Sequence, residues 1–271
     1  MAERPADPAG DPFLRPQWAD PDAVPAGRVR ALMSTRQGGA GQPPFDTCNL
    51  AADPLDPAVA ENRRRFAQAL GATPRWLNQV HGATVLRLGA SPTTGPREAD
   101  ASISTVAGVG CTVFAADCLP VLFCVDGALG VGAAHAGWRG LAGGVLEATV
   151  QALCLAAGQA PRAVQAWLGP CIGPNAFEVG ADVLQAFGRA PDPCDDAHFR
   201  WRPRPDGSAR WHADLPGLAR HRLQQAGVSR ISGGQWCTVS EPSRFFSFRR
   251  DRGSPGSATG RMAAAIALLD A

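Results

Sequence analysis

The chain has 271 residues, of which 45% are hydrophobic and 18% are charged, and its formal net charge is +2. This balance is that of a globular protein and excludes the strongly basic stripe typical of nucleic-acid binders. No stretch reaches the roughly 18 unbroken apolar residues of a membrane span. Every basic residue is arginine and tyrosine is absent, so neither a lysine Schiff base nor a tyrosine acid is available.

The N-terminus and the cysteines bear on where the protein works. The first ten residues are acidic and proline-rich and lack the apolar core of a signal peptide. The eight cysteines show no CxxC pair and no dense, regular spacing. We therefore predict a cytoplasmic location, with the cysteines as free thiols or metal ligands. We expect residues 1–27 to form a disordered or loosely packed segment, with residues 13–18 able to pack on the body.

Hydrophobic patterning predicts one mixed α/β domain over residues 28–271. In the first half of the chain we expect a strand, a helix and a strand, at 29–34, 57–70 and 75–80. Asp56 is the expected N-cap of this helix and Gly71 its C-terminal stop. From 111 on we expect strands at 111–115, 119–125, 128–134, 164–168 and 245–249, and helices at 143–157, 181–187, 215–226 and 262–269. Residues 192–208 are interpreted as a polar insertion with little order. No repeat or linker divides the chain.

A predicted hairpin brings a cysteine and a histidine together. Asp126 and Gly127 form a strong two-residue turn signal between two apolar strands. With that turn, Cys118 lies directly opposite His135 on the same face of the hairpin, with Cβ atoms about 4.5–5.5 Å apart. Pro120 cannot donate to the ladder, so the pairing could open near that end. Thiolate and imidazole together are ligands that zinc accepts well.

Histidine is scarce, with five in the chain, and His81 shares the setting of His135 at a strand end beside glycine. His81, Cys118 and His135 would make the three-ligand set of a catalytic zinc site, which leaves one position for water or substrate. Nothing but its setting links His81 to the other two. Asp117 could orient a ligand or accept a proton. A lone cysteine in an apolar strand is more often a small core residue, and we interpret the cysteines at 111, 124, 154 and 237 in that way.

Arginines beside glycine-rich turns are candidates for anion binding, because guanidinium grips phosphate through a planar fork. Arg36 precedes such a turn, and Arg139 precedes an expected helix start, where backbone N–H groups add to an anion site. Arg249 ends the strand expected at 245–249. Asn49 and Gln79 could supply amide hydrogen bonds to a base or sugar. For any single arginine of this chain, a solvated surface charge is the more common role.

Several segments, taken together and in order, resemble one bacterial family from about residue 29 to the C-terminus. The strongest are NQVHG at 78–82, ADCLPVLF at 116–123, HAGWRG at 135–140, LGPCIGPNAFEVG at 168–180, FFSFRRD at 245–251 and TGRM at 259–262. The turn STRQGG at 34–39 and the segments at 48–50 and 61–66 also fit. The chain is similar to the multicopper polyphenol oxidase or laccase-type family. Its members are now described mainly as purine nucleoside phosphorylases with adenosine deaminase activity.

The resemblance implies a compact α/β/β/α sandwich, monomeric or weakly associating, with one metal held by His81, Cys118 and His135. Zinc is the expected ion, and copper suits the same ligands. We expect catalytic roles for Cys118, His135, Asp117 and Arg36, and substrate contacts from Arg36, Asn49, Gln79, Arg139 and Arg249. Two features depart from the family pattern. Phenylalanine, at 246 or 248, replaces the tyrosine common before the double arginine. The loop at 251–257 looks longer than usual, which leaves the position of Arg261 open.

Three functions follow as hypotheses. The first is phosphorolysis of a purine nucleoside such as adenosine, inosine, guanosine or methylthioadenosine, with deamination of adenosine in the same pocket. The second is slow phenol oxidation by a single copper, since five histidines are too few for a multicopper set. The third is a metal-independent hydrolase with Cys118 as nucleophile, of the kind that edits peptidoglycan precursors. A structural zinc site is a fourth interpretation, but it usually needs four protein ligands.

Overall fold

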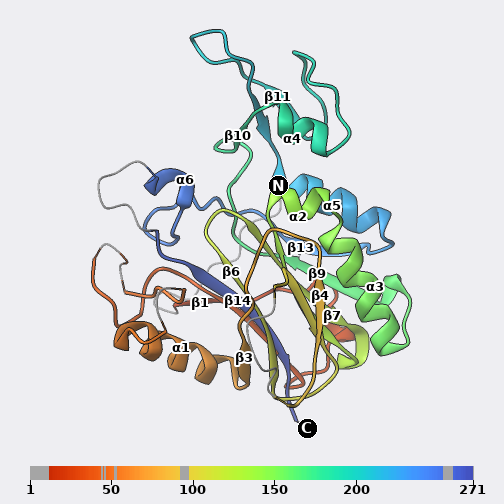
Figure 1. The fold of residues 1–271 in the computed structure, drawn as a ribbon. Helices are drawn as coiled ribbons and strands as arrows, with labels where there is room; N and C mark the ends of the chain where they lie inside the picture. The colour runs from red at the N-terminus through yellow and green to blue at the C-terminus, as the bar shows by residue number, and fades with distance from the viewer. Residues whose placement is uncertain are drawn as a thin grey trace.

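Two β-sheets packed face to face, with helices on their outer surfaces, form the body of the protein (Figure 1). This computed structural model describes residues 12–43, 45, 47–51, 54–91, 98–252 and 259–270. The predicted α/β/β/α fold is confirmed. Within the described residues, no helix is both long and apolar enough to cross a membrane.

The first sheet has five strands in the order β1-β2-β14-β6-β3. Their bounds are Phe13–Leu14, Val29–Ser34, Met262–Leu268, Val109–Ala115 and Thr73–Arg75. Helix α1, Pro57–Leu70, covers its outer face. The side chain of Asp56 accepts a hydrogen bond from the backbone N–H of Ala58, and Gly71 ends the helix at φ 67°. The predicted bounds, N-cap and C-terminal stop of this helix are therefore confirmed. The predicted bounds of β2 are confirmed as well.

The second sheet has six strands in the order β13-β9-β7-β8-β5-β4. Their bounds are Arg230–Gly233, Val164–Leu168, Leu119–Val125, Val131–Ala136, Ala101–Ser104 and Val85–Leu88. Helices α2, α3 and α5, at Trp138–Ala142, Val145–Ala157 and Leu215–Gln225, contribute to the apolar core on the outer side. Short 3-10 turns lie at Pro21–Ala23, Asp126–Ala128 and Pro161–Ala163. The predicted bounds of β7 and β9 are confirmed.

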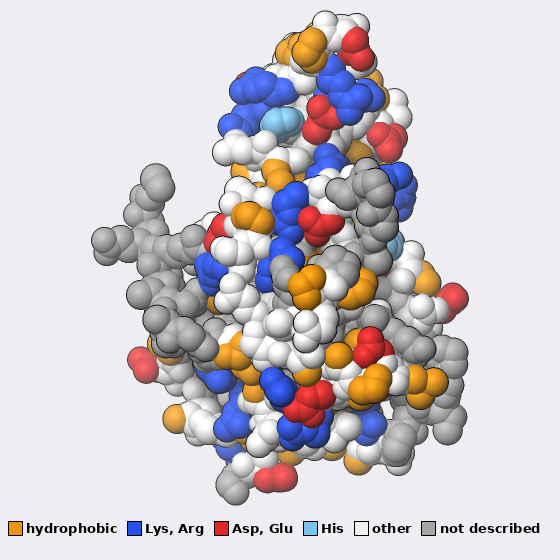
Figure 2. Space-filling model, turned by 90° about the vertical axis from the view of Figure 1, so that its left-hand side faces the viewer, with side chains coloured by type: hydrophobic (Ala, Val, Ile, Leu, Met, Phe, Trp, Pro, Cys, Tyr) orange, Lys and Arg blue, Asp and Glu red, His pale blue; other side chains and the backbone are white. Residues whose placement is uncertain are grey.

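A small lobe projects from one end of the sandwich (Figure 1). It contains the three-stranded sheet β10-β12-β11, at Glu178–Val179, Trp211–Ala213 and Phe199–Trp201, with the short helix α4 at Ala181–Ala186. Its surface carries basic and acidic side chains interspersed (Figure 2). The expectation of little order over 192–208 is therefore wrong in part. Trp201 and Trp211 pack edge to face, with ring centroids 4.9 Å apart, and Trp211 belongs to the same apolar core as the outer side of the second sheet.

Strand β14 is a correction, because a helix was expected over 262–269. Its seven residues are all buried. Alternate side chains face different layers: Ala264 and Ile266 lie between the sheets, while Ala263 and Ala265 pack toward α1. A run of alanine has high helix propensity, but pairing with β2 on one side and β6 on the other overrides it.

The hairpin β7–β8 has a four-residue loop rather than the two-residue turn expected. Val125 donates its N–H to the carbonyl of Gly130, so residues 126–129 form the loop, with Gly127 and Ala128 at positive φ. The returning strand is therefore β8 at 131–136 and not 128–134. Pro120, not Cys118, lies opposite His135. A shift of two residues keeps every side chain on its predicted face, so Cys118 and His135 remain diagonal neighbours.

Three further expectations are corrected. The strand expected at 75–80 is wrong: β3 ends at Arg75, and residues 76–80 form a loop with one isolated bridge at Asn78. The segment expected as a strand at 245–249 instead leads into a one-turn helix α6, Phe248–Asp251, capped by the side chain of Ser247. Residues 13–14 form an edge strand on β2, whereas residues 1–11 lie outside the described part of the chain.

Candidate active site

His81, Cys118 and His135 meet at one end of the sandwich, where the chain passes from the first sheet into the second. Cys118 immediately precedes β7, His135 lies in β8, and His81 lies in the loop between β3 and β4. The ligand atoms of the three side chains all lie within 4.8 Å of one another. Sγ of Cys118 is 3.8 Å from Nε2 of His81, and the two imidazole rings meet edge to face. The structure thus brings together the three residues predicted as ligands.

Asp100, just before β5, fixes both histidines. Its carboxylate is fully buried and accepts hydrogen bonds from the backbone N–H groups of Val80, His81 and Gly82 at 2.7–3.1 Å. It also contacts Nδ1 of His135 at 2.8 Å. This contact leaves Nε2 of His135 free to face Cys118. One carboxylate therefore orients the loop that carries His81 and the ring of His135.

Backbone strain and close packing mark the same spot. Of the four non-glycine residues with positive φ in the described chain, His81 at 60° and Asp117 at 89° flank the site. Such conformations persist where the surroundings over-determine them, often at functional sites. A Cβ on Gly137 would lie 2.9 Å from both Sγ of Cys118 and Cδ2 of His81. Only glycine leaves room here for the two side chains.

The electrostatics favour a thiolate. Burial by itself would raise the pKa of Cys118, but the imidazoles of His135 and His81 outweigh it and lower the pKa to about 6. Burial would likewise lower the pKa of His135, yet Asp100 and Cys118 raise it to about 9. Burial would raise the pKa of Asp100, but its hydrogen bonds from His135 and the backbone hold it below its usual value. Both shifts favour a thiolate on Cys118 and a proton on His135 when no metal is bound.

The donor set fits a metal ion. Two imidazoles and a thiolate are ligands that zinc takes, and tetrahedral zinc would hold such atoms about 3.5 Å apart, given its bond lengths. The 3.8 Å between Cys118 and His81 is close to that spacing. Asp100 supplies the carboxylate partner that ligating histidines commonly have. The group has three members, as in catalytic rather than structural zinc sites. Copper accepts the same atoms.

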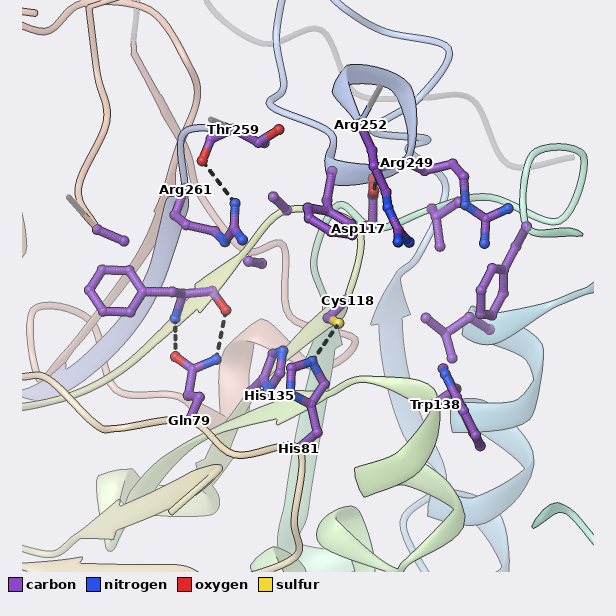
Figure 3. A pocket seen from close by; sticks show the side chains of 18 of the residues that line it. Gln79, His81, Asp117, Cys118, His135, Trp138, Arg249, Arg252, Thr259 and Arg261 are labelled. Atoms are coloured by element: carbon purple, nitrogen blue, oxygen red, sulfur yellow. Dashed lines mark hydrogen bonds between the residues drawn. The ribbon is translucent and has the colours of Figure 1, made fainter. Parts of the chain in front are cut away.

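The three residues lie on the floor of a cavity of about 890 Å³. Three arginines line its walls: Arg249 and Arg252, at and just after α6, and Arg261, just before β14. Figure 3 shows Arg261 on one side of Cys118 and Arg252 and Arg249 on the other. The aromatic side chains in the lining are Phe114, Trp138, Phe177 and Phe248. The cavity therefore combines a thiolate, imidazoles, cations and flat apolar surfaces.

Asp117 holds this arrangement together. Its Oδ1 accepts a hydrogen bond from Oγ1 of Thr238, and its Oδ2 accepts one from the backbone N–H of Arg249 at 2.6 Å. Both carboxylate oxygens are thus engaged in fixing α6 against the segment that leads to β7. Of the two roles expected for Asp117, orienting a ligand and accepting a proton, this geometry favours a positioning role.

The two predicted amide side chains both have structural partners. Gln79 lines the cavity, but its amide makes a pair of hydrogen bonds with the backbone of Phe114. Asn49 is buried outside the cavity lining, and its Oδ1 accepts a hydrogen bond from the backbone N–H of Arg261 at 2.9 Å. Each amide therefore positions a residue that lines the cavity.

Arg249 lines the cavity as expected for a substrate contact, whereas Arg36 and Arg139 do not line it. Nη1 of Arg36 donates to the carbonyl of Pro242, and its guanidinium lies 4.9 Å from the ring of Phe246. Arg139 lies in the short helix α2, ahead of α3, and its guanidinium stacks over the ring of Trp138 at 4.2 Å. Both arginines expected to bind anions are thus directed elsewhere.

Sequence reasoning missed Asp100, Arg252 and Arg261 as site residues. A signal existed for Arg261, because TGRM at 259–262 is among the segments that resemble the family. The expectation of a helix after it hid its position beside the cavity. Asp100 carried no local signal, since its partners lie 18–20 and 35 residues away.

Comparisons with known proteins agree over nearly the whole chain. A family model described as multi-copper polyphenol oxidoreductase laccase matches residues 30–269. A purine nucleoside phosphorylase of Pseudomonas aeruginosa is 48% identical over 93% of this chain and 99% of the relative. The purine nucleoside phosphorylase YfiH of Escherichia coli is 47% identical over 95% and 99%.

Solved structures agree as well. A Neisseria meningitidis protein of the DUF152 family has a TM-score of 0.81 and 42% identity, and the match covers 96% of this chain and 100% of that one. YlmD of Geobacillus stearothermophilus has a TM-score of 0.77 and 32% identity over 91% and 94%.

Proposed function

The chain belongs to the family described as multi-copper polyphenol oxidoreductase laccase, as its motifs predicted, and from this premise we propose that it is a purine nucleoside phosphorylase. Relatives that match almost end to end carry that name, which indicates an enzyme. The observation that carries the proposal is the composition of one cavity. Aromatic side chains suited to a purine and arginines suited to phosphate surround the Cys118–His135 pair.

The reaction joins phosphate to a ribose and releases the base. A phosphate oxygen attacks C1′ of the nucleoside, the C1′–N9 bond breaks, and its electron pair passes to the purine. Arg261 is best placed to hold the phosphate, because it lines the cavity to one side of Cys118 (Figure 3) and its guanidinium is held by the neutral backbone carbonyls of Thr259 and Gly260. Burial lowers the pKa of Arg261, but arginine remains charged in proteins. We therefore transfer to Arg261 the phosphate-binding role expected for Arg36.

The base would lie against the aromatic walls. Phe248 is 46% exposed although it lines the cavity, and it lies 5.8 Å from the guanidinium of Arg261. An exposed ring beside a phosphate-binding arginine suits a ligand that has a flat apolar part joined to a polar one. Phe177 and Trp138 offer further apolar surface.

His81, Cys118 and His135 would hold one zinc or copper ion. Such an ion supplies Lewis-acid polarisation and activates water, which would serve phosphorolysis and the deamination of adenosine. Asp100 keeps Nε2 of His135 directed at the site. The thiolate form of Cys118 is favoured at neutral pH, whereas the raised pKa of His135 means that this ring must release a proton when the ion binds.

The test is a nucleoside assay with defined metal loading. Purified protein is given adenosine or inosine with and without phosphate, and products are separated by chromatography. We expect free base and ribose 1-phosphate only with phosphate, and inosine from adenosine without it. His81→Ala, Cys118→Ala and His135→Ala should each abolish turnover, and His221→Ala, an exposed histidine packed on His198, should not. Absence of all three products at every metal loading would overturn the proposal.

A second candidate rests on the same thiolate. A cysteine with a pKa of about 6 beside a histidine is also the arrangement of a cysteine hydrolase. Full metal removal separates the two: activity that survives chelation but not alkylation of Cys118 favours the hydrolase. Copper loading tests the phenol-oxidase hypothesis in the same way. If the copper-loaded protein oxidises phenols faster than it turns over nucleosides, the phenol oxidase is favoured.

A further inference from the structure

The two arginines of the segment FFSFRRD, Arg249 and Arg250, have different surroundings although they are neighbours in the chain. Arg249 lines the cavity, whereas Arg250 is not among the lining residues. The side chain of Arg250 is 23% exposed, and its guanidinium is hydrogen-bonded to the protein itself. The second arginine is therefore not a substrate contact.

The guanidinium of Arg250 joins α6 to the segment at 238–245. Nη1 donates to the carbonyl of Thr238 at 2.8 Å, and Nη2 donates to the carbonyl of Phe245 at 3.0 Å. Nε donates to the carboxylate of Asp251 at 2.9 Å. A planar guanidinium can bond several acceptors in fixed directions, which the point charge of an ammonium group cannot do. One side chain thus fixes α6 against residues that precede it.

A closed series of hydrogen bonds connects Arg250 to the residue beside Cys118. Thr238, whose carbonyl accepts from Arg250, donates its hydroxyl to Oδ1 of Asp117. Oδ2 of Asp117 accepts the backbone N–H of Arg249. Asp117 directly precedes Cys118 and has a φ of 89°. Arg250 and Asp117 therefore hold α6 together, through Thr238.

Helix α6 needs this support, because a helix of a single turn is not stable by itself. Its residues Phe248 and Arg249, with Arg252 directly after it, line the cavity. The ring of Phe248 is part of the wall against which the purine is proposed to lie. A change in how α6 is held would therefore move the wall that faces the substrate.

The candidate metal ligands are held by other groups. Asp100 accepts the backbone N–H of His81 and contacts the ring of His135. In the described part of the chain, the guanidinium of Arg250 bonds only to residues within 238–251 and to none of the ligands. Loss of this guanidinium should thus disturb the substrate wall and spare the metal site.

We infer that Arg250 is a positioning residue that sets the substrate-binding wall of the cavity through α6, an inference that rests on the proposed phosphorolysis. It acts on the nucleoside through Phe248 and Arg249 and touches neither the nucleoside nor the metal ligands. Its effect therefore falls on KM for the nucleoside rather than on kcat. Lysine at this position keeps the charge but cannot bond both carbonyls and the carboxylate together.

The test measures KM and kcat for inosine in Arg250→Lys and Arg250→Ala, with zinc-loaded protein and saturating phosphate. We expect KM to rise at least about tenfold and kcat to change less than about threefold, because charge-assisted bonds that hold the wall are lost. Zinc affinity should stay unchanged. Added methylguanidinium, which can fill the space of the missing side chain, should lower KM again in Arg250→Ala. Arg64→Ala, which removes a guanidinium from the exposed face of α1, should change none of these values.

The outcomes separate the inference from the proposed function. If inosine is phosphorolysed and KM in Arg250→Lys is unchanged, the inference is wrong and the proposed function stands. A fall in zinc affinity would also overturn the inference, since Arg250 would then support the metal site. If the unsubstituted protein phosphorolyses no nucleoside, the proposed function is wrong, and calorimetry with inosine decides the inference. Weaker binding in Arg250→Lys supports it, and equal binding, or no binding by any of the proteins, overturns it.

Discussion

The carboxylate of Asp100 lies 2.8 Å from Nδ1 of His135, and both side chains are buried. The same carboxylate receives the backbone N–H of His81 at 2.9 Å. One acidic group therefore sets the direction of two of the three candidate ligands, from a position 35 residues before one of them.

Replacing Asp100 by Asn should weaken metal binding. The amide is uncharged, and it must present its oxygen to the backbone N–H groups and to Nδ1 of His135 at once. Loss of the carboxylate partner of a ligating histidine typically costs about 10- to 100-fold in metal affinity. Competition titration of zinc against a chromophoric chelator measures the change.

Asp214→Asn is the matched control for this variant. Asp214 caps α5 by accepting the N–H of Gly217, and asparagine caps a helix about as well as aspartate, so this variant should change neither thermal stability nor zinc affinity. An Asp100→Asn protein that binds zinc as tightly as the original would contradict the orienting role of Asp100.

The thiol of Cys118 should react with iodoacetamide in a pH-dependent way in metal-free protein. Its pKa is lowered to about 6, so the thiol is almost fully ionised at pH 7.5. The reactive thiolate is lost as the pH falls through 6. Burial raises the pKa of Cys111 and Cys124 to about 12, and these two thiols serve as unreactive references within the chain.

Peptide mass spectrometry after timed alkylation gives the rate for each cysteine. Zinc should suppress the reaction at Cys118, and His135→Gln should move its midpoint to higher pH, because a cationic partner is lost. A midpoint above 8 in the unsubstituted, metal-free protein would show that the histidines do not stabilise the thiolate.

The pairing of Cys118 with His135 could be predicted because side chains along a strand alternate between its two faces. The pairing of Cys118 with His135 was predicted from a two-residue turn, and the actual loop is two residues longer. The two residues still meet, because a two-residue shift leaves each side chain on the same face. A one-residue shift would have separated them.

Other parts could not be predicted from local pattern. His81 lies in a loop whose shape depends on Asp100, a contact between distant segments. The alanine-rich run of β14 resembles a helix until its two neighbouring strands are known. Since Arg261 immediately precedes β14, the error in this element also concealed a cavity residue.

Gly137 should be sensitive to the smallest substitution. The Cβ of Gly137→Ala would lie 2.9 Å from Sγ of Cys118 and from Cδ2 of His81, so at least one ligand must move. A displacement of about 1 Å can cost on the order of 100-fold in rate, and we expect a loss of that size in nucleoside turnover with zinc affinity also reduced.

Gly89→Ala provides the comparison, because a Cβ at Gly89 meets no atom within 4 Å. Both proteins should fold, as judged by circular dichroism, and only Gly137→Ala should lose activity. Full activity in Gly137→Ala would show that the two ligands have more freedom than the structure gives them.

Asn49 should influence phosphate binding without touching the phosphate. Its Oδ1 accepts the backbone N–H of Arg261 at 2.9 Å and that of Ala51 at 3.2 Å. Asn49→Ala leaves both N–H groups without this acceptor, at a cost of about 1–3 kcal/mol in stability, and frees the segment that carries Arg261. We expect KM for phosphate to rise about tenfold, which corresponds to 1.4 kcal/mol, while zinc affinity stays unchanged.

Asn175→Ala is the control, because it removes an exposed hydrogen bond to Arg200 on the lobe and should leave KM for phosphate unchanged. If zinc affinity falls together with phosphate binding in Asn49→Ala, the residue supports the whole site rather than Arg261 in particular.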